Sequence, residues 1–165
     1  MPPINVPNPE QNTTSPISPE AQLAGFLAKY TPEIAALAEG ALAKMRSYLP
    51  GATELVYDNY NALAIGFGPS ERASEAIFSI ALYPRWVSLF FLHGAGLPDP
   101  DRLLQGTGTA ARHMIFKSPA TLDEPGVQVL IEQALLSAAV PIDPTRPGQL
   151  LIKSVSASQR PRRPA

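Results

Sequence analysis

The sequence predicts an α+β fold, a two-layer sandwich in which an antiparallel sheet of about five strands carries two long helices on one face. Three features of the printed sequence indicate this fold. An apolar stripe at three- and four-residue steps comes first, short runs with a period of two fill the middle, and a second helical stripe follows. With 165 residues, 45% of them hydrophobic, the chain is long enough for one domain with a substantial core.

Start and stop signals bound the expected helices. Thr31-Pro32-Glu33 offers an N-cap, a proline for the first helical position and an acid for the first turn, and Pro50-Gly51 ends this long helix. Asp123 is the expected N-cap of the second long helix, with Pro125 in its first turn. A shorter helix is expected to begin after Ser18 and to run to about residue 29.

The runs between the long helices alternate apolar residues with small or polar ones, which is typical of an antiparallel meander. Because side chains alternate across a strand, one set should face the helices and the other should face away. The expected inward residues are Leu63, Ile65, Phe67, Phe78, Ile80 and Leu82, and the expected outward residues are Ala62, Ala64, Gly66, Ser79 and Ala81. The small outward residues leave room for a ligand, edged by Tyr83, Trp86 and Phe90. The alternative interpretation, equally favoured, is that the C-terminal segment or a second subunit covers this face.

Composition divides the chain into three parts. Residues 1–19 are rich in proline and are expected to form a disordered leader. Residues 20–140 form the α+β domain, and residues 141–165 form a C-terminal arm with a basic tail. Residues 150–155 either add an edge strand or belong to a loosely held arm. Disorder is expected from Gln159 onward.

Composition also restricts the function. The chain has no cysteine, which excludes disulfides, thiolate nucleophiles and thiolate-bound metal clusters. The N-terminal stretch lacks the pattern of a signal peptide, and no apolar run reaches the ~18 residues of a membrane span, so a cytoplasmic location is expected. Arg160, Arg162 and Arg163 make the tail basic, but the tail has no aromatic residue and the rest of the chain is mildly acidic. We therefore expect neither nucleic-acid nor membrane binding.

Several separated motifs resemble the YdhG-like domain family in the same order, over roughly residues 22–138. They are Tyr30-Thr31-Pro32-Glu33-Ile34, Pro50-Gly51-Ala52-Thr53-Glu54 leading into Tyr57-Asp58-Asn59-Tyr60, Leu89-Phe90-Phe91, Leu104-Gln105-Gly106-Thr107-Gly108 before Arg112-His113, and the helix after Asp123. The resemblance implies a small cytosolic bacterial α+β domain whose biochemical role is mostly undefined. One branch of the family is regarded as frataxin-like, which implies iron binding and a role in iron–sulfur cluster assembly. Frataxins carry an acidic ridge, whereas the first long helix here has only Glu33 and Glu39 among basic residues.

The stretch from Glu54 to Asn61 is the first candidate site. Its polar side chains could form a binding cluster where the sheet begins, made of Glu54, Tyr57, Asp58, Asn59 and Tyr60. Alternatively, Glu54 accepts bonds from the backbone or an arginine, and Asp58-Asn59 makes a turn. The sequence leaves both interpretations open.

Two further groups are weaker candidates. His93 and His113, with carboxylates in the loop between them, would suit iron or zinc if they converged, and otherwise each histidine caps a sheet edge. Arg112, close after the glycines of residues 106–108, would suit an anion, although a flexible turn explains these glycines as well.

These features favour a non-enzymatic binding module, with or without homodimerisation, that holds a small molecule or a protein partner on the outer sheet face and at the Glu54–Asn61 stretch. No cofactor is expected. The alternative, implied by the resemblance, is a frataxin-like iron-binding protein that works with the iron–sulfur assembly machinery. An enzyme using Glu54 or His93 ranks last, because no nucleophile, base and orienting group can be assigned together.

Overall fold

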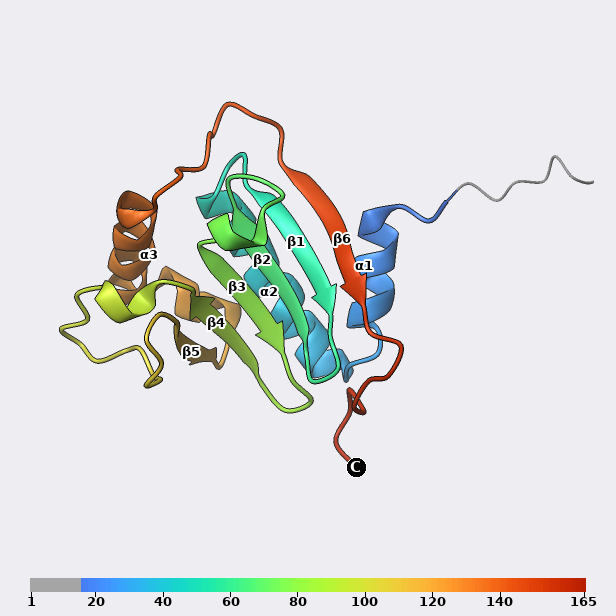
Figure 1. Cartoon of the computed structure of the whole chain (residues 1–165). Helices are drawn as coiled ribbons and strands as arrows, with labels where there is room; N and C mark the ends of the chain where they lie inside the picture. Colours follow the sequence, from blue (N-terminus) through green and yellow to red (C-terminus); the bar gives the residue numbers. More distant parts are fainter. Residues whose placement is uncertain (1–15) are drawn as a thin grey trace, which may run out of the picture.

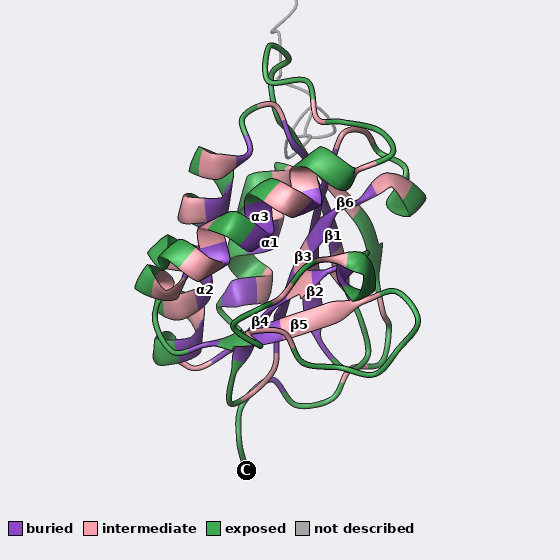
Figure 2. Ribbon diagram, turned by 90° about the vertical axis from the view of Figure 1, so that its left-hand side faces the viewer, coloured by how far each residue is buried: buried purple, intermediate pink, exposed green. Residues whose placement is uncertain are grey.

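The fold is α+β, as predicted, with three helices on one face of an open six-stranded sheet (Figures 1 and 2). The computed structural model describes residues 16–165, so most of the expected disordered leader lies outside the described residues. The strand order is β5-β4-β3-β2-β1-β6. The helices and strands are α1 (Pro19–Leu27), α2 (Pro32–Tyr48), β1 (Thr53–Asp58), β2 (Leu63–Gly68), β3 (Phe78–Leu82), β4 (Val87–Phe91), β5 (Arg112–Phe116), α3 (Pro125–Ser137) and β6 (Gln149–Val155).

The sequence signals set the first two helices as expected. Ser18 caps α1 by accepting from the Ala21 amide at 3.1 Å, and Thr31 caps α2 through the Ile34 amide at 3.4 Å. Gly51 has a φ of +83°, a left-handed conformation that suits glycine and turns the chain from α2 into β1. α2 packs across β3 and β4, whereas α1 packs on β6.

The third helix begins differently from the prediction. Asp123 ends a 3₁₀ turn, Pro119–Asp123, and Glu124 is the residue before α3, without a side-chain cap bond. Asp123 instead accepts bonds from Lys44 and from the Tyr48 hydroxyl, both on α2. The predicted cap was wrong because Pro125 occupies the first helical position, which makes Glu124 the N-cap and leaves Asp123 free to join two helices.

The predicted alternation in the middle strands is confirmed. β2, β3, β4 and β5 form consecutive antiparallel pairs, and the six expected inward residues of β2 and β3 are all fully buried in the core. Buried residues gather between the helices and the sheet (Figure 2). The purely antiparallel five-stranded sheet was only roughly right, because β6 adds a sixth strand parallel to β1.

The outer face of the sheet carries the expected small residues of β2 and β3, and none of α1, α2 and α3 covers it (Figure 1). Residues 69–77, between β2 and β3, cross its upper part, where Ala76 lies against Gly66. The C-terminal segment does not fold over this face, because β6 extends the sheet beside β1. No helix among residues 16–165 is long and apolar enough to cross a membrane.

The basic tail is not disordered as expected. The Ser156 amide donates to the Asp58 carbonyl at 2.8 Å, and the Arg160 amide donates to the Tyr60 carbonyl at 2.9 Å. Arg162 is buried, with 5% of its surface exposed. The tail therefore docks on the turn between β1 and β2, at the lower end of the sheet in Figure 1.

Candidate functional site

The predicted polar cluster of residues 54–61 is divided by the sheet. In the β1–β2 register Glu54 pairs with Phe67 and Asp58 pairs with Leu63, so both carboxylates lie on the helix-covered face, at opposite ends of β1. Tyr57 lies on the outer face. Its hydroxyl is buried and has no hydrogen-bond partner within residues 16–165. The remaining members of the cluster, Asn59 and Tyr60, are exposed in the turn that follows β1.

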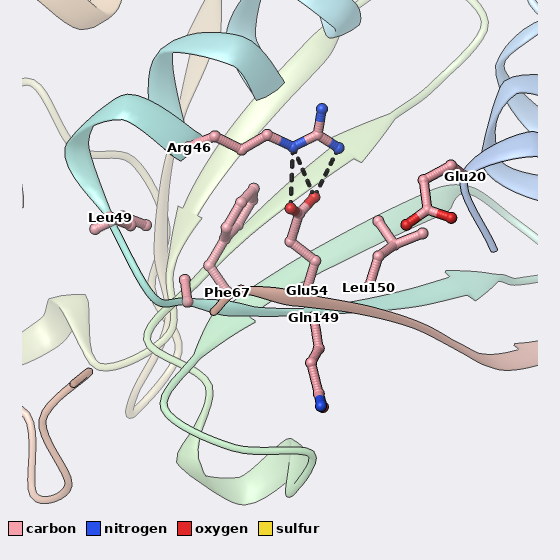
Figure 3. A pocket seen from close by; sticks show the side chains of 9 residues that line it. Glu20, Arg46, Leu49, Glu54, Phe67, Gln149 and Leu150 are labelled. Carbon is pink, nitrogen blue, oxygen red and sulfur yellow. Dashed lines mark hydrogen bonds and ion pairs between the residues drawn. The ribbon is translucent and has the colours of Figure 1, made fainter. Parts of the chain in front are cut away.

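Glu54 pairs with Arg46, from the last turn of α2 (Figure 3). The Nε of Arg46 lies 3.1 Å and 2.9 Å from the two carboxylate oxygens, and Nη2 lies 2.8 Å from one of them. The hydrogen bonds that Arg46 donates to Glu54, opposed by partial burial, raise the pKa of Arg46. The third nitrogen, Nη1, bonds to none of the other residues drawn in Figure 3.

This ion pair lines a pocket of about 350 Å³ between α1, the end of α2 and the edge made by β1 and β6. Its apolar wall comes from Leu49, Ala52, Phe67 and Leu150. An adjoining hollow of about 180 Å³ runs between α1 and α2 and shares Glu20, Arg46 and Leu150 with it. The pocket therefore combines apolar walls with a few charged groups, as small-molecule sites do.

The charge of the pocket is negative on balance. Glu20, at the start of α1, places a second carboxylate near Arg46, and its field contributes to the raised pKa of that arginine. None of the other lining residues bonds to Glu20 (Figure 3). Two carboxylates thus face one guanidinium, which favours a ligand with a positive charge.

Asp58, at the other end of β1, is enclosed by cations. Lys29 Nζ lies 2.9 Å from one carboxylate oxygen and Arg162 Nη2 lies 2.9 Å from the other. Burial opposes ionisation of Asp58, but the hydrogen bonds from Lys29, Gln159 and Arg162 outweigh it, and the pKa of Asp58 is lowered. Only 1% of the Asp58 side chain and 4% of the Arg162 side chain are exposed.

Arg162 has further partners that fix the tail. It donates to the Asn59 carbonyl and, at 3.4 Å, to the Tyr60 carbonyl. Its guanidinium also lies 5.8 Å from the centre of the Tyr30 ring. The Tyr30 hydroxyl in turn accepts from Leu63 and donates to the Leu82 carbonyl. The Asp58 carboxylate is therefore enclosed by its partners and acts as a structural anchor for the tail.

The predicted aromatic residues lie in two places. Tyr83 and Trp86 stack at 4.7 Å in the turn between β3 and β4, where Trp86 remains 40% exposed. Phe90 lies on the outer face and stacks on His113 of the neighbouring strand at 5.1 Å. The sheet separates these rings from the Arg46–Glu54 pocket, so they do not join Glu54 in one site.

The two histidines do not converge. His113 lies on the outer face with Phe90, whereas His93 lies beside Ala134 of α3 and its C-cap Ala138, on the helix-covered side. In the described part of the chain, no three His, Cys, Asp or Glu side chains are grouped so that they could hold a metal ion. The predicted pair of histidine ligands is therefore not assembled by this fold.

Arg112 does not gather anion-binding amides around it. Its Nη1 donates to the carbonyls of Gly108 and Ala111, at 2.6 Å and 2.8 Å. Gly106 has a φ of +120°, and the Gln105–His113 bridge closes the loop. These contacts agree with the turn interpretation of residues 106–109.

Sequence reasoning missed Arg46, Glu20 and Arg162. Arg46 lies only eight residues before Glu54 at a helix C-terminus, which is a local signal that could have paired them. Glu20 and Arg162 gave no such signal, because α1, β6 and the tail reach β1 only through the tertiary fold.

The fold and pocket define a small α+β domain with a charged, partly apolar hollow at one sheet edge. No family model, curated protein or solved structure matches the chain. The resemblance to YdhG-like domains therefore stays a prediction.

Proposed function

We propose that this protein is a non-enzymatic binding module that holds a small molecule with an amine and a short apolar body in the Arg46–Glu54 pocket. The observation that carries the proposal is the placing of two carboxylates and one guanidinium beside an apolar wall. A pocket of about 350 Å³ is at the lower end of the range for small-molecule sites, which fits a ligand of few heavy atoms.

Each part of the pocket has a distinct role in this proposal. Glu20 receives the amine, since none of the other lining residues bonds to its carboxylate (Figure 3). Phe67 and Leu150 contact the apolar body. Arg46 engages both oxygens of Glu54, which leaves Glu20 as the carboxylate that receives the amine.

The same contacts favour binding over catalysis. Both oxygens of Glu54 accept from Arg46, so the carboxylate is engaged before a substrate arrives. A general base needs an oxygen within hydrogen-bond reach of the proton that it removes. Glu54 therefore serves here as the partner that positions Arg46.

Matched ligands test the proposal. Isobutylamine and isobutyric acid have the same branched body and opposite charge, and saturation-transfer NMR measures their binding to the full chain. Wild type should bind the amine and not the acid. Glu20→Gln should weaken the amine several-fold, whereas Glu33→Gln, an exposed acid in the first turn of α2, should leave binding unchanged. Equal binding of acid and amine, or no effect of Glu20→Gln, would refute the proposal.

A further inference from the structure

The end of the sheet opposite the pocket combines exposed aromatic rings with basic side chains. The turns after β1 and β3 and the docked tail all lie there (Figure 1). We call this surface the aromatic–basic end, and it consists of Tyr60, Tyr83, Trp86, Lys29, Arg85, Lys117, Arg160 and Arg163. Lys117 belongs to it because Phe116, the residue before it, pairs with Val87, which follows Trp86.

The aromatic rings each have one covered face and one open side. Arg160 lies 5.6 Å from the centre of the Tyr60 ring, and Tyr60 is still 48% exposed. Trp86 stacks on Tyr83 at an interplanar angle of 20° and is 40% exposed. The Tyr60 ring, packed against the Arg160 guanidinium, and the Trp86 ring, packed against Tyr83, are thus both accessible to solvent.

Positive charge surrounds these rings. Five cations are exposed at this end. Among residues 16–165, the side-chain carboxylates placed there are those of Asp58, which is buried in ion pairs, and of Glu33, at the start of α2. The net charge of the whole chain is only −1, so this end differs in sign from the rest. Such a local field attracts polyanions even when the protein as a whole is nearly neutral.

We propose that the aromatic–basic end binds single-stranded nucleic acid. Bases stack on Trp86 and Tyr60, and Arg85, Arg160 and Arg163 contact phosphates. The sequence argued against this partner because the tail has no aromatic residue, but the fold brings the tail against Tyr60 and places Tyr83 and Trp86 at the same end of the sheet. Open rings favour a polynucleotide over an acidic polypeptide, since every base has a face to stack and a carboxylate has none.

The chain contains a built-in reporter, because Trp86 is its only tryptophan. Titration with a labelled oligothymidylate of about 12 nucleotides, a length within the usual site sizes, should quench Trp86 fluorescence to saturation. The anisotropy of the label should rise in parallel. Trp86→Ala should weaken binding roughly 5- to 150-fold, as expected for the loss of one stacked base.

Charge variants separate contact from general attraction. The double variant Arg160→Gln with Arg163→Gln should weaken binding and should flatten the plot of log K against log salt by about 1.4, or about 0.7 for each lost phosphate contact. Arg72→Gln is the matched control, because Arg72 is exposed between β2 and β3 at the opposite end of the sheet.

Three results would overturn the proposal. The first is the absence of quenching and of any anisotropy change at low salt. The second is equal binding of duplex DNA of the same length. The third is equal quenching by polyglutamate with the same loss on Arg160→Gln, which would assign the surface to an acidic protein partner. None of them bears on the amine pocket, which lies at the other end of β1.

Discussion

Replacing Arg162 with alanine is expected to lower the free energy of unfolding by about 2–3 kcal/mol. Arg162 donates to the buried Asp58 carboxylate at 2.9 Å and to two backbone carbonyls of the following turn. Loss of one partner of a buried ion pair costs about 3–5 kcal/mol when the other charge is left alone. Asp58 keeps Lys29 at 2.9 Å, so the loss should stay below that range.

The measurement is equilibrium unfolding in urea. With a slope of about 2 kcal/mol per molar, the midpoint should fall by about 1 M or slightly more. Arg163→Ala is the matched control, because Arg163 is exposed and makes only two long bonds, of 3.2 Å and 3.4 Å, to carbonyls of Lys29 and Ala28. Its midpoint should change little, since exposed substitutions usually cost less than about 0.5 kcal/mol.

Substitution of Asp58, the other partner of this ion pair, gives a second test. Asp58→Asn removes the charge that holds Arg162 and should cost about 3–5 kcal/mol, because a buried guanidinium then has no counter-ion. If Arg162→Ala unfolded at the same urea concentration as Arg163→Ala, the tail would not be docked in solution, and the reasoning from burial would fail.

Three further outcomes are expected. The pKa of Asp58 is lowered in the folded protein, so its ion pairs stabilise the fold above pH 3.8, the ordinary pKa, and this stabilisation is lost as the pH falls below that value. Acid unfolding should show the loss in wild type and not in Asp58→Asn. Identical acid-unfolding curves for the two proteins would contradict this expectation. Gly51→Ala should lower the melting temperature, because residue 51 has a positive φ and the added Cβ would lie 2.0 Å from the Asp143 carbonyl oxygen. Gly25→Ala is the control on α1, where the added Cβ meets open space, and it should raise the melting temperature slightly. Titration calorimetry with ferrous iron should show no micromolar binding that depends on His93, because the two histidines lie on opposite sides of the sheet. Micromolar binding in wild type that is lost in His93→Ala would contradict this expectation.

Periodicity predicted the elements well, because it reports directly on which side chains are buried. The inward set of β2 and β3 is an example, with every member fully buried. The direction of β6 was not predictable in the same way, because the residue pattern of a single strand does not show whether it pairs in parallel or antiparallel. The mistaken Asp123 cap had a local cause, because Pro125 at the first helical position makes Glu124 the N-cap. The partners that Asp123 has instead, Lys44 and Tyr48, are more than 70 residues away and could not be predicted.

Burial of the docked tail could not be predicted from composition. A segment of prolines and arginines buries little apolar surface, which is why residues from Gln159 onward were expected to be disordered. Its order rests on an ion pair between residues 104 positions apart and on hydrogen bonds from Ser156, Arg160 and Arg162 to carbonyls of residues 58–60. Composition carries no information about such a pair, because both partners must first be placed by the sheet.

The two carboxylates of β1 differ in what their partners allow. The Asp58–Arg162 pair is almost completely enclosed, so opening it would expose two unpaired charges to a dry interior. Arg46, in contrast, has 47% of its side chain exposed and Glu54 has 12%, so water can replace a ligand there at little cost. A ligand-binding carboxylate must be stable both with and without its ligand. Of the two carboxylates on β1, only Glu54 meets that condition, which is why the amine proposal rests on its pocket.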